Sequence, residues 1–295
     1  MNPVDKRRVG AAFSRSADAY DAHAEVQVRV RERALGLAAA VAPAAGRVLD
    51  VGAGTGALLA RLAAERPALL AAAVDLAPGM CARARVAAPR AALAAADAEA
   101  LPFRAGVFDL VVSTSTLQWL PRLEPSLAEM RRVLAPGGAV CVALFGERTL
   151  HELRRAWRSA ANAARASDGR AAGTHRFASH AALESALAAA GLQPAAVHEE
   201  ELVEWHADAR AVLRALKALG ASSAVPGRAG LGGRRVTLEM LRRYEEAHAG
   251  PAGVPATYHV LYAVARAAVT ARRSPPSPRA PSSGPAAPSR AGTGS

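Results

Sequence analysis

A short apolar segment runs into three glycines at alternate positions in the stretch RVLDVGAGTG, residues 47–56. The apolar residues predict a buried strand of a parallel sheet. Glycine lets the chain turn sharply there and lets a ligand approach the bare backbone. The Ala/Leu-rich segment 57–65 predicts a helix whose first N–H groups are unpaired and whose dipole is positive at this end. This arrangement is typical of a site for a nucleotide-type ligand.

An acidic residue follows at the distance that such a ligand requires. Segment 71–75 predicts a second strand that ends in Asp75, about 20 residues after the glycines, where a carboxylate can bind ribose hydroxyls. The third glycine comes one residue earlier than in the dinucleotide fingerprint, and Asp50 precedes the first glycine. The stretch therefore resembles the first motif of the class I S-adenosylmethionine (SAM) methyltransferases. The glycines alone leave open another nucleotide cofactor or a plain glycine-rich turn.

The following segments complete a parallel sheet. Segment 91–96 predicts a third strand that leads to Asp97, which can accept the exocyclic amine of adenine or be a solvated loop acid. Segment 108–113 predicts a central fourth strand, and residues 114–120 after it are expected to present the methyl group. A helix over 123–134, stopped by Pro136-Gly137-Gly138, and a strand over 139–145 follow. Alternating strands and helices predict a doubly wound α/β sheet that binds its ligand at the carboxyl ends of the strands. The predicted cofactor-binding residues are Asp50, Gly52, Gly54, Gly56, Asp75, Leu76, Asp97, Ala98 and Ser113.

The first 45 residues precede this unit. Val9, Phe13 and Tyr20 lie at near-helical spacing, and residues 24–41 predict a longer helix. Aromatic and polar groups so close to the glycine motif are expected to form a helical flap over the cofactor. Ordinary amphipathic packing is the alternative for each residue.

Composition limits the other functions. The 295 residues carry a net charge of +12, but arginine almost wholly replaces lysine, and no aromatic-studded basic groove is visible, so we expect no nucleic-acid partner. The sequence has no apolar run of about 18 residues, which argues against a membrane span. The basic N-terminus lacks the apolar core of a signal peptide. Cys81 and Cys141 are expected to be unlinked thiols, which favours a cytoplasmic location.

The second half of the chain carries a family resemblance. Its segments are GERTLHELRRAW (146–157), HRF (175–177), LRALKALGA (213–221), GR (227–228) and PATYHVLY (255–262). Together with Phe13, Tyr20, Asp21 and Gln27, this series resembles the malonyl-acyl-carrier-protein O-methyltransferases of biotin synthesis, the BioC family. The resemblance spans about residues 5–268. The chain departs from the family pattern at the glycine-rich segment 231–235.

The resemblance implies a seven-stranded Rossmann-like sheet, SAM as methyl donor and methylation of the free carboxylate of a malonyl thioester. It divides the chain into an N-terminal helical flap (1–45), a methyltransferase domain (46–270) with cap insertions at about 147–180 and 207–250, and a disordered Pro/Ser/Ala/Gly tail (271–295). Two segments also resemble a mitochondrial complex I assembly factor. The rival functions are therefore a SAM methyltransferase for another small acid or a quinone, and a non-biotin assembly-factor-like protein.

A carboxylate acceptor sets the expected chemistry. It is already ionised at neutral pH, so the enzyme needs an anion clamp and an in-line approach more than a general base. Arginine suits a clamp because its planar fork binds carboxylates bidentately. Arg148 and Arg228 are the clamp candidates and Lys217 is the third, although each could be a surface cation. Tyr20 is expected beside the reacting groups, and Gln27, Tyr258 and His259 are expected in the substrate-pocket wall, although His259 also suits a structural role.

The implied partner is an acidic acyl carrier protein that bears the malonyl group, or malonyl-coenzyme A. Two groups of arginines could steer such a carrier. They are Arg29, Arg31 and Arg33 before the sheet, and Arg154, Arg155 and Arg158 after the fifth strand. A solvated helix face is the alternative for all six.

Overall fold

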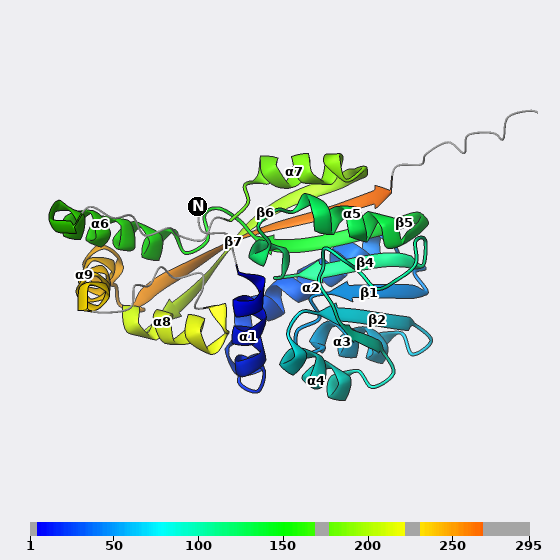
Figure 1. Cartoon of the computed structure of the whole chain (residues 1–295), viewed down its shortest axis with the longest axis horizontal. Coiled ribbons are helices and arrows are strands. Elements are labelled where there is room, and N and C mark those ends of the chain that lie inside the picture. Colours follow the sequence, from blue (N-terminus) through cyan, green and yellow to red (C-terminus); the bar gives the residue numbers. More distant parts are fainter. Residues whose placement is uncertain (1–4, 169–176, 222–230, 268–295) are drawn as a thin grey trace, which may run out of the picture.

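A single mixed sheet forms the centre of the protein, in a computed structural model that describes residues 5–168, 177–221 and 231–267 (Figure 1). The strand order is β3-β2-β1-β4-β5-β7-β6, with β1 to β5 parallel and β7 antiparallel to both of its neighbours. The strands are β1 (Arg47–Val51), β2 (Leu70–Asp75), β3 (Ala92–Ala95), β4 (Phe108–Thr114), β5 (Leu134–Phe145), β6 (Leu192–His206) and β7 (Val254–Ala267). This order confirms the predicted doubly wound, mostly parallel seven-stranded sheet.

Helices cover both faces of the sheet. They are α1 (Lys6–Ser16), α2 (Glu25–Val41), α3 (Ala57–Glu65), α4 (Pro78–Ala87), α5 (Glu124–Val133), α6 (His151–Asp168), α7 (His180–Ala189), α8 (Ala209–Ala218) and α9 (Leu231–His248), with short 3-10 turns η1 (Asp21–His23) and η2 (Leu117–Trp119). In α2 the buried residues Val26, Val30, Ala34 and Ala38 recur at every fourth position, which gives the helix one apolar stripe against the sheet. The predicted helices 57–65 and 24–41 are thus confirmed.

The central strand β5 shows how the two layers of the core form. Its side chains alternate between the faces, so that Ala139, Cys141 and Ala143 join the layer of α2 while Val140 and Val142 join the opposite layer of α5 and α7. Cys141 is fully buried and its thiol donates to the carbonyl of Ala34 at 3.3 Å. The two cysteines are free thiols, as the sequence suggested.

The start of β5 differs from the prediction. Helix α5 ends at Val133, one residue before the predicted end, and the strand begins at Leu134, five residues before the predicted start at Ala139. Leu134 pairs with Phe108, whereas the next pairing partner of β4 is Ala139, so the Pro-Gly-Gly segment lies in a register shift inside the strand. Gly137 adopts φ 77°, which glycine tolerates. The helix ends before the Pro-Gly-Gly segment, so this segment does not stop it. The segment instead shifts the register in which β5 pairs with β4.

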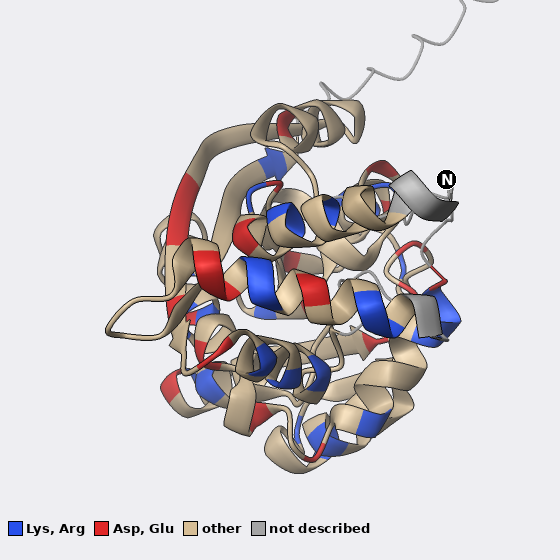
Figure 2. Cartoon of the chain, turned by 90° about the vertical axis from the view of Figure 1, so that its left-hand side faces the viewer, with Lys and Arg blue, Asp and Glu red and all other residues tan. Residues whose placement is uncertain are grey.

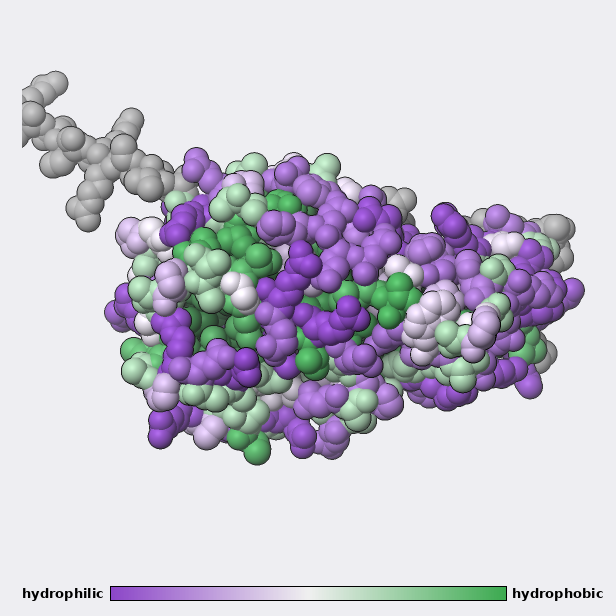
Figure 3. All heavy atoms as spheres, turned by 180° about the vertical axis from the view of Figure 1, so that it is seen from behind, coloured by the Kyte–Doolittle hydropathy of each residue, from purple (hydrophilic) through white to green (hydrophobic). Residues whose placement is uncertain are grey.

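Strands β6 and β7 extend beyond the other strands and carry a helical end, formed by α6, α8 and α9 (Figure 1). Helix α6 packs on α9, and Trp157, Met240 and Tyr244 are buried there. The glycine-rich segment 231–235 lies in the start of α9. Seen from behind, this end is mostly hydrophilic, whereas apolar patches lie on the sheet body (Figure 3).

Among the described residues, no helix is both long and apolar enough to cross a membrane. The predicted tail, residues 271–295, lies outside the described part of the chain.

Candidate functional site

A cavity lies at the carboxyl ends of β1, β2 and β4, under helix α1. We call it the cofactor cavity. Its walls include Gly52, Gly54, Asp75, Leu76, Asp97 and Ala98 from the sheet and its loops, and Lys6, Val9, Gly10, Phe13 and Tyr20 from the N-terminal segment. The parallel strands bring these loops to one edge, as the sequence predicted. Helix α1 lies within the predicted flap (1–45) and forms one wall of the cavity.

The glycine loop is shaped by close contacts. Gly52, Gly54 and Gly56 have φ values of 83°, 55° and 85°, which side chains rarely adopt. A Cβ on Gly52 would lie 2.0 Å from Thr116 Oγ1, and one on Gly56 would lie 2.7 Å from the Cα of Ala84. A Cβ on Gly54 would meet no atom within 4 Å. Gly52 and Gly56 therefore permit packing, whereas Gly54 faces the open cavity and leaves its backbone accessible to a ligand.

Asp75 closes the second strand and is held by the glycine loop. Its Oδ2 accepts from the N–H of Gly54 and its Oδ1 from the N–H of Ala77, both at 2.8 Å. Burial raises the pKa of Asp75, and the N–H donors of Ala77, Gly54 and Leu76 oppose that shift. The carboxylate is thus fixed in orientation at the cavity wall. Each of its oxygens keeps a second lone pair for a ligand hydroxyl.

Helix α1 is fastened over the cavity by Lys6. Its Nζ lies 2.8 Å from Asp97 Oδ2 and also binds Glu99. Gly79 of α4 packs against the backbone of Ser14, so a side chain there would force the two helices apart. The hydroxyl of Thr55 donates to Asp21 Oδ1 at 2.8 Å, which joins the segment after α1 to the glycine loop. The N-terminal segment is therefore fixed by contacts to two loops of the sheet and to α4.

Asp50 lies behind the glycine loop, where its Oδ1 has no hydrogen-bond partner among the described residues. It is 1% exposed and lines a side cavity together with Tyr20, Gln27, Arg31 and Gly54. Burial, and next the charge of Asp75, raise the pKa of Asp50 to about 7. An unpaired buried carboxylate oxygen facing a cavity suits a ligand with a cationic or N–H group.

Two predicted cofactor residues do not line these cavities. Gly56 packs on Ala84, as described above. Ser113 is fully buried, and its hydroxyl donates to the carbonyl of Val51 at 2.7 Å, which ties β4 to β1. The residues that reach the cofactor cavity from this strand end are the next three, Thr114, Ser115 and Thr116. Ser113 itself does not line the cofactor cavity, because its hydroxyl is bonded to the backbone of β1.

A second cavity adjoins the first and shares Phe13, Tyr20, Ser115 and Trp119 with it. We call it the acceptor cavity. Its other walls are Gln27, Gln118, Phe145, Thr149, Leu150, Phe177, Leu216, Leu219, Ala221 and Tyr258. None of these lining residues, within the described ranges 5–168, 177–221 and 231–267, is an acid, a base or a histidine. An uncharged cavity beside a cofactor cavity suits the transfer of a small group between two bound molecules.

Tyr20, Gln27 and Tyr258 lie where the sequence placed them, in the wall of the acceptor cavity. Tyr20 also lines the cofactor cavity, and burial with the nearby charges of Asp75 and Asp21 raises the pKa of its phenol. It therefore stays protonated, and its O–H can donate a hydrogen bond. Tyr258 bonds to Glu204, so it contributes chiefly its ring to the cavity.

Arg148 is not among the residues that line the acceptor cavity. Its Nη2 lies 2.8 Å from Glu199 and its Nε 2.9 Å from Glu201, two residues of β6. These carboxylates raise the pKa of Arg148, and the bonds from Arg148, His180 and His259 lower the pKa of Glu199 to about 2. His259 is 1% exposed and bonds to the same Glu199 through Nε2 at 3.0 Å, which is a structural position. This geometry gives no support to Arg148 as a clamp or to His259 as a pocket wall.

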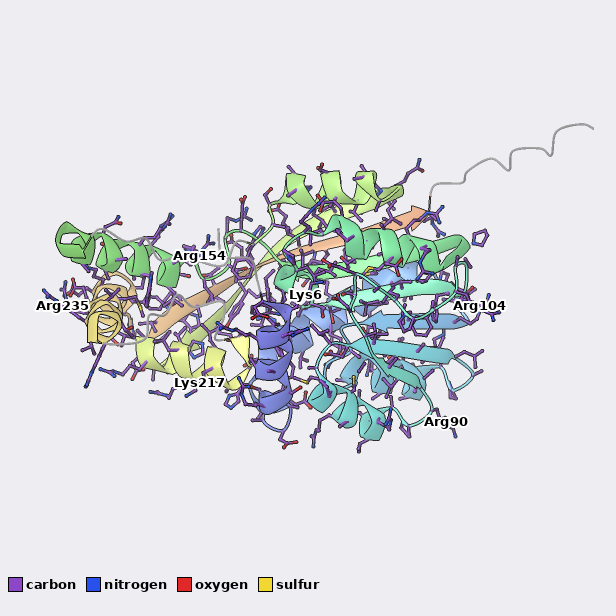
Figure 4. The ribbon with its side chains drawn as sticks, viewed as in Figure 1. Lys6, Arg90, Arg104, Arg154, Lys217 and Arg235 are labelled. Carbon is purple, nitrogen blue, oxygen red and sulfur yellow. The ribbon has the colours of Figure 1, made fainter. Side chains whose placement is uncertain are left out.

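The remaining predicted cations lie elsewhere. Lys217 is exposed on α8 and does not line the acceptor cavity, although its neighbour Leu216 does (Figure 4). Arg228 lies outside the described residues, so its role remains a prediction. Arg33 pairs with Glu200 at 3.0 Å, whereas Arg155 and Arg158 are exposed on α6.

The structure adds cavity residues that the sequence did not single out. Gln118 is 4% exposed, and Ser115 adopts φ 52°, which is uncommon outside glycine. Both fall in the segment 114–120 that was predicted to present the methyl group. The sequence predicted that this segment lies at the site. It could not predict which of its side chains enter the cavity, because that depends on the turn after β4.

The residues present fit the SAM that the sequence motifs suggest. Asp75 suits ribose hydroxyls, the backbone at Gly54 is open, and the unpaired oxygen of Asp50 suits an ammonium group. Asp97 already binds Lys6, and its Oδ1 accepts from the N–H of Glu99, so a base amine would share this carboxylate.

Comparisons with known proteins agree with this geometry. A family model described as a methyltransferase domain matches residues 49–142. The chain is 48% identical over 268 residues to the malonyl-[acyl-carrier protein] O-methyltransferase of Geobacter sulfurreducens, covering 89% of this chain and 99% of that relative. It is 40% identical to the protein of the same name from Halorhodospira halophila, with 89% and 90% covered. It is 36% identical to the biotin biosynthesis bifunctional protein BioHC of Cellvibrio japonicus, covering 88% of this chain and 50% of that relative.

Solved structures share the fold. A putative methyltransferase from Bacillus halodurans superposes with a TM-score of 0.56 at 17% identity, covering 80% of this chain and 97% of that chain. The YcgJ protein of Bacillus subtilis gives a TM-score of 0.55 at 16% identity, with 80% and 98% covered. At these identities the likeness concerns the fold alone.

Proposed function

The chain belongs to the malonyl-[acyl-carrier protein] O-methyltransferases, and we propose that it acts as its named relatives do. It transfers a methyl group from SAM to the free carboxylate of a malonyl thioester. The products are the methyl ester and S-adenosylhomocysteine.

One observation carries this proposal beyond the family assignment. The cofactor cavity, with Asp75 on its wall, adjoins an acceptor cavity whose described lining is uncharged, and the two share Tyr20 and Ser115. A methyl donor in the first cavity and an acyl group in the second would meet at these shared residues. Reacting groups held this close gain most of their acceleration from proximity and orientation.

The cofactor-binding residues have separate tasks. Asp75 binds the ribose hydroxyls, the Gly54 backbone allows close approach, and Asp50 faces the amino-acid end of the ligand. Helix α1, fastened through Lys6 and Asp97, excludes water from above. Bound SAM supplies an electrophilic methyl group on a sulfonium.

No described acceptor-cavity residue is suited to act as a base, and the proposed reaction requires none. A carboxylic acid with a reference pKa of about 4 is already ionised at neutral pH. Tyr20 stays protonated because its pKa is raised, so it orients rather than deprotonates. The enzyme's task is to place an anion in line with the methyl group.

The acyl carrier protein is the proposed carrier, and malonyl-coenzyme A is the alternative. Arg155 and Arg158 are exposed on α6, and Arg154 lies over the ring of Phe177, a residue of the acceptor-cavity wall, at 5.9 Å. A basic helix beside the cavity suits an acidic carrier that delivers its acyl group inward. The helical end carries both basic and acidic residues (Figure 2). We therefore expect the attraction for an acidic carrier to come from α6 rather than from the whole end. Esterification masks the malonyl charge, so that the chain can then be elongated as an ordinary acyl group toward the pimeloyl part of biotin.

An acceptor panel tests the proposal. The full chain is incubated with labelled SAM and, separately, with malonyl-acyl carrier protein, acetyl-acyl carrier protein, a free dicarboxylic acid and a quinol. We expect base-labile label on the malonyl carrier alone. Label on the quinol or the free acid instead would favour the rival methyltransferase functions.

A further inference from the structure

Three neutral side chains of the acceptor cavity have buried polar atoms that lack hydrogen-bond partners among the described residues. They are Gln118 Oε1, Ser115 Oγ and Gln27 Oε1. Two other polar groups of the wall are already bonded. Thr149 bonds to the backbone of His259, and Tyr258 to Glu204. The three unpaired groups are therefore available to a ligand.

Gln118 is the most deeply placed of the three. It lies in η2, is 4% exposed and lines the acceptor cavity. A buried amide oxygen with no partner destabilises the free protein, and it is tolerated most readily where a ligand completes its bonding. The amide can present either its oxygen or its NH₂ group to the cavity, because the two ends interchange by rotation.

Ser115 lies at the junction of the cavities. It belongs to the walls of both, and its φ of 52° is one of two positive values among the described non-glycine residues. Its N–H donates to the carbonyl of Ala143 at 2.8 Å, which fixes the turn after β4. The fixed turn places the Ser115 hydroxyl beside the position where the two ligands meet.

We propose that Gln118 and Ser115 hold the acceptor carboxylate by neutral hydrogen bonds, and that no cation among the described residues forms a salt bridge with it. This proposal rests on the proposed function. One carboxylate oxygen forms a bond to the methyl carbon, the bond from that carbon to sulfur breaks, and its electron pair stays on sulfur. No proton is transferred.

The charge balance favours neutral donors. The carboxylate is negative and the sulfonium positive, and both charges diminish as the reaction proceeds. An arginine on the carboxylate would stabilise the starting anion more than the charge-depleted transition state, which slows the step. An amide and a hydroxyl orient the carboxylate and stabilise its starting charge less than an arginine would. An uncharged wall also strengthens the attraction between the anion and the sulfonium.

The test replaces Gln118 by Met, which has a similar length and no hydrogen-bonding group. For Gln118→Met, kcat/KM with malonyl-acyl carrier protein should fall about 10- to 100-fold, the loss expected for a hydrogen bond to a charged group. SAM affinity by calorimetry should be unchanged. The melting temperature should hold or rise, because an unpaired buried polar group is removed. A residue with only a structural role would lower it.

Ser115→Ala provides a second variant, expected to lose activity in the same way, and it decides the question if Gln118→Met fails to fold. Arg148→Met is the matched control, since Arg148 pairs with Glu199 and Glu201 outside the cavity and should retain near wild-type activity. Arg228→Met tests the clamp candidate that lies outside the described residues.

Full activity in Gln118→Met and Ser115→Ala, together with a large loss in Arg228→Met or Arg148→Met, would overturn the proposal in favour of a cation clamp. Failure of the wild-type chain to esterify malonyl-acyl carrier protein would instead refute the proposed function itself.

Discussion

Asp75 makes the most direct prediction at the scale of single residues. Its oxygens are oriented by Gly54 and Ala77 toward a ligand in the cofactor cavity. A charge-assisted hydrogen bond contributes roughly 1.5–3 kcal/mol, so Asp75→Ala should raise the SAM dissociation constant about tenfold or more. Isothermal calorimetry measures the change. Asp18→Ala, at a side chain 93% exposed on the surface, is the control and should bind as wild type. Unchanged affinity in Asp75→Ala would show that the ribose is held elsewhere.

Asp50 predicts a pH dependence of the ligand-free protein. Its folded pKa, about 7, is raised from 3.8 by burial, so the folded state holds a proton in this window that the unfolded chain has lost. The stability that depends on this proton falls as the pH rises through the window. Asp50→Asn cannot ionise, so its melting temperature should exceed that of wild type by more at about pH 8 than at about pH 5. Equal melting curves at both pH values would contradict the buried, unpaired state of Asp50.

Some site residues could be predicted because they belong to one contiguous motif. Others could not, because their contacts join distant segments of the chain. The glycines and Asp75 could be predicted because strand, turn and carboxylate follow one another along the chain. The partners of Arg148 could not, because Glu199 and Glu201 lie 51 and 53 residues away and reach it through the pairing of β6 with β7. Gln118 was missed because a glutamine in a polar loop carries no signal until the turn after β4 buries it.

Helix α1 supplies a prediction at the scale of an element. Lys6 joins this helix to Asp97 and Glu99 across the cofactor cavity, and Asp5 caps its first turn. Lys6→Met should loosen the flap and weaken SAM binding several-fold, mainly through faster dissociation, since the closed flap blocks the exit. Stopped-flow fluorescence of Trp119 in the cavity wall measures that rate. Arg7→Met, an exposed cation in the same turn, is the control. An unchanged dissociation rate in Lys6→Met would show that the ion pairs do not hold the flap.

Most elements could be predicted because apolar runs and breakers mark them. The helix 57–65 and the five parallel strands needed only local patterns and the rule that successive βα units build a parallel sheet. The start of β5 could not be predicted, because its register shift depends on pairing with Phe108 and Leu110 of β4. A Pro-Gly-Gly segment reads as a helix stop in sequence, whereas here it lies within the strand.

The distribution of charge over the whole molecule predicts how the carrier protein docks. Arg155 and Arg158 are exposed on α6, at the helical end, whereas Arg90 and Arg104 lie at the opposite end of the protein (Figure 4). The double variant Arg155→Glu/Arg158→Glu should raise the KM for malonyl-acyl carrier protein about tenfold at low salt and change that for malonyl-coenzyme A much less. The effect should shrink as salt is added, because exposed charges are screened.

Arg90→Glu/Arg104→Glu carries the same change of net charge and should leave both KM values near wild type. An equal effect of the two double variants would show that only net charge matters. Unchanged kinetics in both would place the docking surface away from α6.

The most direct test of the central claim identifies the product itself. Malonyl-acyl carrier protein is incubated with the full chain and SAM carrying a trideuterated methyl group, and the carrier is analysed by intact-mass and fragment mass spectrometry. We predict that the carrier gains the mass of one labelled methyl group, located on the terminal carboxylate of the malonyl unit, with one equivalent of S-adenosylhomocysteine formed. A labelled methyl on any other atom of the carrier, or no mass gain although SAM binds, would contradict the assignment of a carboxyl methyltransferase.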